Sequence, residues 1–128
     1  YIMSIRILLI IGAGGFLGTI ARYLTQQGVS KILPVIFPFG TLAVNIAGCF
    51  LIGIFYALAD RGNALSPEWR IFLTTGFCGG FTTFSTFSYE SYNLIRDEQY
   101  LFLSLYIGIS VIIGIMATFA GIILIRSL

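Results

Sequence analysis

Four long stretches without a charged residue alternate with short polar segments along this chain. The uncharged stretches cover residues 7–21, 32–59, 71–89 and 99–125. About 20 consecutive apolar residues are needed to cross the hydrocarbon core of a bilayer. The pattern therefore predicts an all-α integral membrane protein with four transmembrane helices, at about residues 3–26, 35–59, 67–95 and 99–126.

The third stretch has a composition that does not suit an unbroken helix. Residues 76–87 read GFCGGFTTFSTF, which places three glycines, four hydroxyl side chains and four phenylalanines in twelve residues. This composition predicts a break in the third helix near the middle of the membrane. Backbone groups freed by a break in hydrocarbon must line a cavity, bind an ion or be covered by protein. The break therefore points to ion or solute handling.

The overall composition agrees with a membrane location and excludes other classes. Hydrophobic residues make up 58% of the chain and charged residues 9%, whereas roughly a quarter of an average soluble domain is charged. Histidine is absent, no span holds a pair of acids, and no catalytic motif is present, so an enzyme is not expected. A scattered net charge of +2 does not suggest nucleic-acid binding. Cys49 and Cys78 are expected to act as small packing residues, without a disulfide.

The charges at the two ends of the predicted bundle are nearly balanced. With four spans, one side carries Arg6, Arg61, Arg70 and Arg126, and the other carries Arg22, Lys31 and Arg96. Orientation in a membrane is normally set by an excess of Lys and Arg on the cytoplasmic side. The balance permits insertion in both orientations, although a few well-placed charges would also fix a single orientation.

The chain is predicted to form one membrane domain, residues 1–128, without a separate soluble part.

Small residues are spaced for close contacts between helices. Pairs four residues apart occur on the first three predicted helices: Gly14 and Gly18, Ala43 and Ala47, and Gly76 and Gly80. Four helices of this length enclose little volume, so a pore is more easily built from two or more copies. The same pairs would also pack helices within one subunit, so they permit oligomers without requiring them.

Neutral polar side chains gather within the predicted spans. They are Thr41 and Asn45 on the second helix, the hydroxyls of the break including Ser85, and Tyr106, Ser110 and Thr118 on the fourth. The last three share one helical face with Gly114, which leaves a gap in a track of hydroxyl groups. The positive ring edges of Phe84 and Phe87 and neutral donors suit a small anion, bound weakly enough to leave again. The alternative is that these groups only join helices.

The break also frees carbonyl groups between residues 79 and 83. Two copies related by a two-fold axis would bring four carbonyls around one monovalent cation, with no carboxylate to attract a divalent ion. The alternative is a kink that neighbouring side chains cover.

Three blocks together resemble a known family. They are GGFLG at 14–18 followed by ARY at 21–23, FGTLAVNIAG at 39–48, and GFCGGFTTFSTFS at 76–88. Together they resemble the Fluc family of microbial fluoride channels, also called CrcB proteins, over essentially the whole chain. The third block is the most specific.

The resemblance implies a passive fluoride exporter in the cytoplasmic membrane of a bacterium. It implies an antiparallel, dual-topology homodimer with two pores that exclude chloride. By position, Asn45 is similar to the pore asparagine of that family, and Phe84 and Phe87 to the aromatics whose edges meet the ion. Ser110 and Thr118 match the polar track, with Tyr106 near one end, and Gly114 stands where some relatives have a hydroxyl.

The resemblance also assigns roles at the break and beside it. The carbonyls of Gly79 and Thr82 match those that hold a central sodium ion (Na⁺) at the dimer axis. Arg22 matches an arginine near the pore mouth, where it would concentrate anions or anchor the helix at the interface. Glu90 is an acid beside an anion route, and its expected role is to pair with or cap a neighbouring group.

Two other readings compete with a fluoride channel. A small multidrug or cation transporter also has four spans and dual topology, but those proteins depend on a carboxylate in the first span, and residues 7–21 contain none. A non-transporting scaffold subunit would use the polar cluster only to hold helices together. Flux from the pure protein in lipid vesicles separates a scaffold from a channel.

Overall fold

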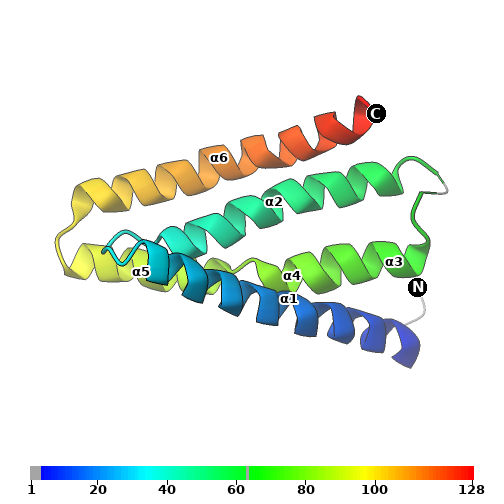
Figure 1. Cartoon of the computed structure of the whole chain (residues 1–128), viewed down its shortest axis with the longest axis horizontal. Coiled ribbons are helices and arrows are strands. Elements are labelled where there is room, and N and C mark those ends of the chain that lie inside the picture. Colours follow the sequence, from blue (N-terminus) through cyan, green and yellow to red (C-terminus); the bar gives the residue numbers. More distant parts are fainter. Residues whose placement is uncertain (1–3, 63) are drawn as a thin grey trace.

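Long helices running roughly along one direction make up this protein in the computed structural model, which describes residues 4–62 and 64–128. Figure 1 shows α1 (Ile5–Ile32), α2 (Phe39–Ala59) and α6 (Tyr100–Arg126) as continuous helices. Among the described residues, these three are long and apolar enough to cross a membrane. Residue 3, the predicted start of the first helix, lies outside the described residues.

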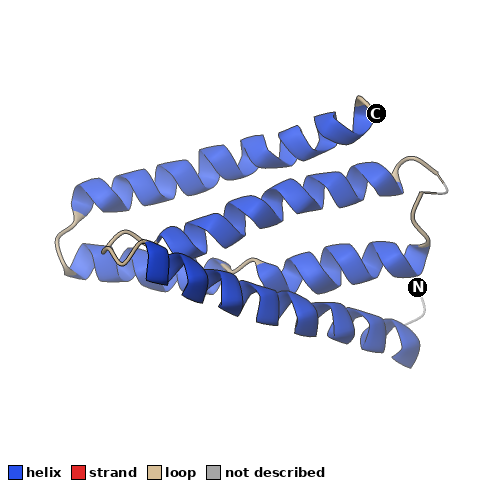
Figure 2. Cartoon of the chain, viewed as in Figure 1, coloured by secondary structure: helices blue, strands red, loops and turns tan. Residues whose placement is uncertain are grey.

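The remaining region is helical but interrupted. It begins with α3 (Pro67–Ile71), continues through a π-helical segment, η1 (Phe72–Cys78), and ends its first half with α4 (Gly79–Phe81). After two extended residues the chain resumes as α5 (Phe84–Arg96). Figure 2 shows this interruption as a short loop between two helical halves. The π turn lies directly before it, and such widened turns are common where a helix serves a functional site.

Side-chain caps fix where several helices begin. The Ser4 hydroxyl accepts a hydrogen bond from the Ile7 amide, and the Ser66 hydroxyl accepts one from the Trp69 amide. Thr83 does the same at the start of α5, where its hydroxyl accepts from the Thr86 amide. Each cap satisfies an amide that the first turn of a helix leaves without a backbone partner.

Glycines allow the helices to approach closely. A side chain at Gly14 or Gly18 of α1 would collide with the backbone oxygens of Phe72 or Phe77, respectively. Gly80 of α4 is equally close to α1, so α1 packs tightly on η1 and α4. Gly53 of α2 and Gly121 of α6 likewise allow their two helices to approach closely. Among the described residues, α2 and α6 form the most extensive helix pairing.

The small residues of α2 differ in how they are placed. Ala43 is half-buried and Ala47 is exposed. Within the chain, Gly48 makes a close contact, because a Cβ there would collide with the side chain of Thr82. A contact of the Ala43–Ala47 pair with another helix stays a prediction.

The first loop also differs from its prediction. The sequence predicts a loop at residues 26–34, whereas α1 continues to Ile32 because no helix-breaking residue precedes Pro34. The second helix begins at Phe39 instead of residue 35, since Pro34 and Pro38 hold the intervening chain in a non-helical path. The predicted ranges 67–95 and 99–126 agree with α3–α5 and α6 to within a residue.

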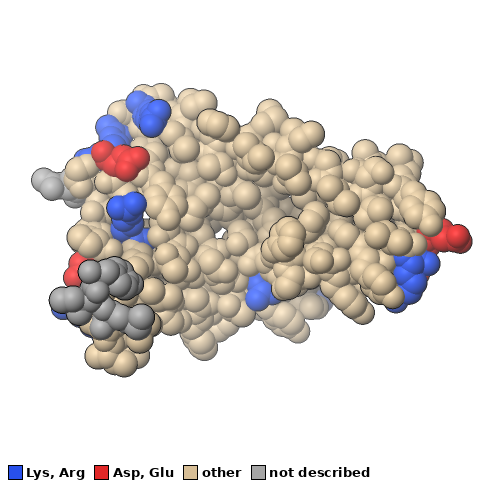
Figure 3. All heavy atoms as spheres, turned by 180° about the vertical axis from the view of Figure 1, so that it is seen from behind, with Lys and Arg blue, Asp and Glu red and all other residues tan. Residues whose placement is uncertain are grey.

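Charged side chains lie mostly at the two ends of the molecule. Figure 3 shows most of the visible Lys and Arg gathered there, with one basic patch on an otherwise uncharged surface between. Large apolar side chains are exposed along that surface, among them Phe16, Leu101 and Phe119. An exposed surface of this composition suits contact with lipid chains.

Replacing Gly18 with alanine tests the close packing of α1. The added methyl group collides with the Phe77 carbonyl, so Gly18→Ala is expected to lower the free energy of unfolding by about 1–3 kcal/mol. Gly12→Ala is the matched control, because open space surrounds Gly12 on the same helix. Thermal unfolding in detergent measures both, and equal midpoints for the two variants would contradict the packing described here.

Candidate functional site

Asn45 bridges the interruption between α4 and α5. Its side-chain oxygen accepts a hydrogen bond from the Thr83 amide at 2.8 Å, and its side-chain nitrogen donates to the Thr83 carbonyl at 3.2 Å. One side chain on α2 thus satisfies both backbone groups of a residue that lies outside any helix. The second N–H of the Asn45 amide has no protein partner in the described part of the chain, so it remains available to a ligand.

The hydroxyl groups that follow the interruption are mostly committed to local structure. The Thr83 hydroxyl accepts from the Thr86 amide and donates to the Thr86 hydroxyl, both at 3.1 Å. Ser85 lies 3.3 Å from the same Thr83 oxygen and is exposed. Ser85 therefore keeps more freedom to bind a ligand than Thr83 does.

Arg22 reaches the interruption from α1. Its Nε donates a hydrogen bond to the Gly80 carbonyl at 3.0 Å. The helix that ends at Phe81 leaves this carbonyl without a helical partner, so the guanidinium supplies one. Arg22 therefore contacts the break directly, beyond the two roles expected from the sequence, and its other N–H groups remain free for anions.

Gly79 and Thr82, whose carbonyls the sequence assigned to a cation, line a cavity of about 350 Å³. Among the described residues, neither carbonyl accepts a hydrogen bond from a side chain or from backbone outside the helices. Asn45, Thr74 and Phe84 also line this cavity, and no acidic residue does. Unpaired carbonyl oxygens without a carboxylate fit a monovalent cation better than a divalent one.

An aromatic chain runs from the interruption toward α6. The Phe84 and Phe87 ring centroids are 5.5 Å apart, and those of Phe87 and Tyr106 are 5.0 Å apart. Phe87 is half-buried and Tyr106 is fully buried, whereas the Phe84 side chain is 79% exposed. Phe84 therefore projects away from the rest of the chain, directly after the break.

The polar face of α6 is only partly satisfied by the protein. The Tyr106 hydroxyl donates to Oε1 of Glu90 at 2.9 Å, and the Thr118 hydroxyl donates to the Cys49 carbonyl at 3.1 Å. Between them, the Ser110 hydroxyl is buried and has no hydrogen-bond partner within residues 4–62 and 64–128. A buried hydroxyl without a partner is costly unless something else occupies the site. Glu90 pairs with a neighbouring group, as the sequence had led us to expect.

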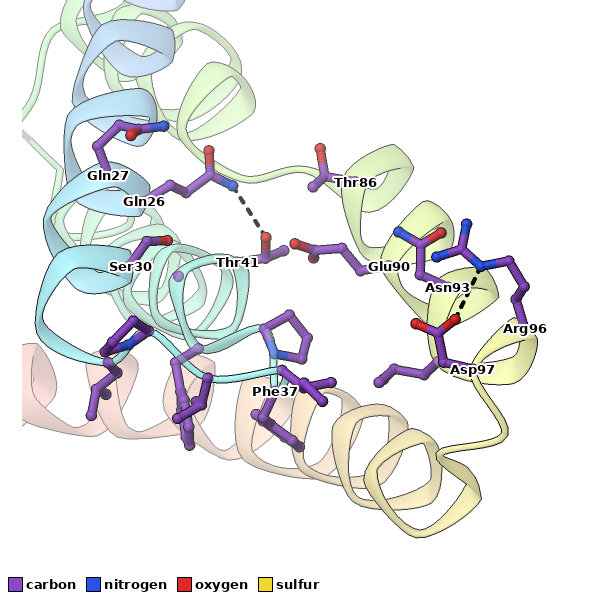
Figure 4. Close-up of a pocket in the computed structure, with 18 residues that line it drawn as sticks. Gln26, Gln27, Ser30, Phe37, Thr41, Thr86, Glu90, Asn93, Arg96 and Asp97 are labelled. Atoms are coloured by element: carbon purple, nitrogen blue, oxygen red, sulfur yellow. Dashed lines mark hydrogen bonds and ion pairs between the residues drawn. The ribbon is translucent and has the colours of Figure 1, made fainter.

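A second cavity, of about 520 Å³, opens between the ends of α1, α2 and α5. Figure 4 shows Gln26 donating to the Thr41 hydroxyl, at 3.2 Å, while the Glu90 carboxylate points toward them. Thr41 is buried beneath this cavity. The cavity carries polar surface from the end of the bundle to Glu90, whose carboxylate accepts a hydrogen bond from Tyr106. This arrangement fits an entrance near the polar face of α6.

Comparison with known proteins identifies the family. The model of the family described as CrcB-like protein, Camphor Resistance (CrcB), matches residues 9–122. The chain belongs to this CrcB family. The matched range includes both halves of the interrupted helix and nearly all of α6.

Curated relatives in the CrcB family are similar over almost their full length. A protein of Flavobacterium psychrophilum is 47% identical over 92% of this chain and 95% of its own. One of Chlorobium luteolum is 52% identical over 90% and 88%, and one of Leptospira interrogans is 46% identical over 94% of both. Each of these relatives is named a fluoride-specific ion channel, FluC.

Most of the candidate site residues of this CrcB-family chain lie near one another. Hydrogen bonds and ring contacts connect Asn45 with Thr83, Arg22 with Gly80, and Phe84 with Tyr106 through Phe87. Sequence reasoning did not include Gln26, although its position one turn after Arg22 on the same face of α1 was a usable signal. It also treated Cys49 only as a packing residue.

Replacing Asn45 tests its role at the interruption. Asn45→Ala leaves the Thr83 N–H and C=O without partners, so the free energy of unfolding is expected to fall by about 3 kcal/mol. The Thr83 amide should also exchange with solvent faster in hydrogen-exchange NMR. Ser104→Ala is the control, because the Ser104 hydroxyl bonds only to its own helix. Unchanged exchange at Thr83 would show that Asn45 does not hold the break.

Proposed function

We propose that this protein is a fluoride-selective ion channel that lets F⁻ leave the cell passively and so protects against fluoride toxicity. The observation that carries the proposal is the buried, unpartnered Ser110 hydroxyl on a face that also holds Tyr106 and Thr118. The face begins beside the Phe84–Phe87 pair. The relatives named as fluoride-specific channels support the same assignment.

The proposed chemistry follows from the charge of the groups along this face. Fluoride is small and tightly hydrated, so a pore must replace its water with closely spaced donors. Hydroxyl and amide groups and the positive edges of aromatic rings supply such contacts without a fixed positive charge that would trap the ion. A narrow aromatic passage would also exclude chloride by size.

The proposed assembly is an antiparallel homodimer of four-span subunits with two pores, in the cytoplasmic membrane of a bacterium. In this arrangement, α3, η1, α4 and α5 together make the third span. The 79% exposure of Phe84 beside a break rich in hydroxyls supports it, because such a surface at mid-membrane needs a protein cover. The nearly equal numbers of basic residues at the two ends permit opposite orientations.

A sodium ion at the dimer axis is part of the same proposal. The carbonyls of Gly79 and Thr82 from two subunits would hold it, and the ion would join the two breaks. The unpaired state of both carbonyls and the absence of acids around their cavity support a Na⁺ site.

The alternative of a small multidrug or cation transporter requires a carboxylate in the first span, and this chain has none there. No carboxylate lies in α1 between Arg6 and Arg22, so no acid is available there to exchange protons for a cationic drug. A scaffold subunit remains distinguishable by experiment, because it would release no ion from vesicles.

Ion efflux from proteoliposomes tests the function. The purified protein is expected to release fluoride and to retain chloride. Phe84→Ile and Phe87→Ile should each reduce fluoride efflux by about tenfold or more, because an aliphatic side chain lacks the positive ring edge. Phe16→Ile is the matched control, since Phe16 is an exposed phenylalanine of α1 that is not part of the Phe84–Phe87–Tyr106 contacts. Equal release of chloride and fluoride would refute the proposal.

Cation exchange tests the sodium site separately. In detergent, the midpoint of thermal unfolding of the dimer should rise with Na⁺ concentration, because an ion that binds only the folded state stabilises it. N-methylglucamine at the same ionic strength is the control and should give no rise. Identical unfolding curves in the two cations would exclude a Na⁺ site of functional strength.

A further inference from the structure

The polar face of α6 contains a gap at Gly114. Tyr106, Ser110, Gly114 and Thr118 follow one another at four-residue intervals and so lie on one side of the helix. Gly114 is buried and offers no donor of its own. An ion moving along α6 would therefore meet no α6 side-chain donor for two helical turns, between Ser110 and Thr118.

Cys49 of α2 lies over this gap. A Cβ placed on Gly114 would lie 3.5 Å from the Cys49 sulfur, which is ordinary contact distance, and would meet no other atom within 4 Å. The sulfur of Cys49 therefore faces the space that a side chain at position 114 would occupy. Thr118 fixes this register, because its hydroxyl donates to the Cys49 carbonyl at 3.1 Å.

The thiol of Cys49 is also free and only half-buried. Cys49 lines the 350 Å³ cavity together with Asn45, Thr83 and Phe84. No acceptor among the described residues takes its S–H. One turn away on α6, the Ser110 hydroxyl is buried and unpartnered. The Cys49 thiol and the Ser110 hydroxyl are thus two unused donors near Gly114, the position at which α6 supplies no donor.

We propose that the Cys49 thiol fills the gap at Gly114 and donates its S–H to the passing anion. This inference rests on the proposed fluoride channel and adds a donor from α2 to a track otherwise supplied by α6. A thiol is a weak donor, so it contributes a contact while holding the ion only loosely.

Cys78 provides an internal comparison. It is a second free cysteine that lines the same cavity, but it comes from η1 instead of α2. A general effect of removing a thiol from this cavity would appear at both cysteines. If the thiol acts as a donor in the polar track of α6, fluoride efflux should slow only when Cys49 is replaced.

The test uses fluoride efflux from proteoliposomes with five proteins: wild type, Cys49→Ala, Cys49→Ser, Cys78→Ala, and the double variant Cys49→Ala with Gly114→Ser. Cys49→Ala is expected to slow efflux roughly fivefold, because one hydrogen bond to an anion is lost. Cys49→Ser and Cys78→Ala should conduct at least half as fast as wild type. The double variant should recover the lost flux, because its hydroxyl enters the same space from α6.

The outcomes separate this inference from the function on which it rests. If wild type releases no fluoride, the channel proposal fails, and this inference fails with it. If wild type conducts and Cys49→Ala conducts equally well, Cys49 contributes no donor. Size-exclusion chromatography and thermal unfolding check that each variant folds. Slow efflux from a folded Cys49→Ala protein that Gly114→Ser does not restore would show that Cys49 only packs against α6.

Discussion

The structure depends on how unpaired backbone groups are satisfied at the interruption between α4 and α5. A helix interrupted in hydrocarbon exposes amides and carbonyls that no water can reach, and each would cost several kcal/mol. Asn45 satisfies both groups of Thr83, Arg22 takes the Gly80 carbonyl, and the Thr83 hydroxyl caps α5. Without these partners, a continuous helix would be the more stable form of this segment.

These partners also require close packing between helices. Arg22 reaches Gly80 because glycines on α1 let it lie directly against η1 and α4. Asn45 reaches Thr83 because Gly48, one turn later on α2, leaves room for the side chain of Thr82. Each glycine therefore serves the break indirectly, by placing a polar side chain within hydrogen-bond distance of it.

The groups left over are those that suit an ion. Structural hydrogen bonds occupy many of the polar atoms near the break in the described part of the chain, and among those left over are the Ser110 hydroxyl, the Cys49 thiol and one N–H of Asn45. All three are neutral donors, and they come from α2 and α6, the two helices that pack together most extensively. A rigid pair of helices can hold donors at fixed spacing, which a selective passage for a small anion needs.

The sequence by itself determined the helical class, the membrane environment and the position of the break, because long apolar runs and clustered glycines act locally. It also proposed Asn45, Phe84 and Phe87 as site residues from their chemistry, and the polar face of α6 from helical periodicity, which fixes which residues share a side. Only the tertiary structure decided that Asn45 binds Thr83, that Arg22 binds Gly80 and that Cys49 faces Gly114. These contacts join residues from different helices, and their distances depend on how closely the helices pack, which spacing along one chain does not specify.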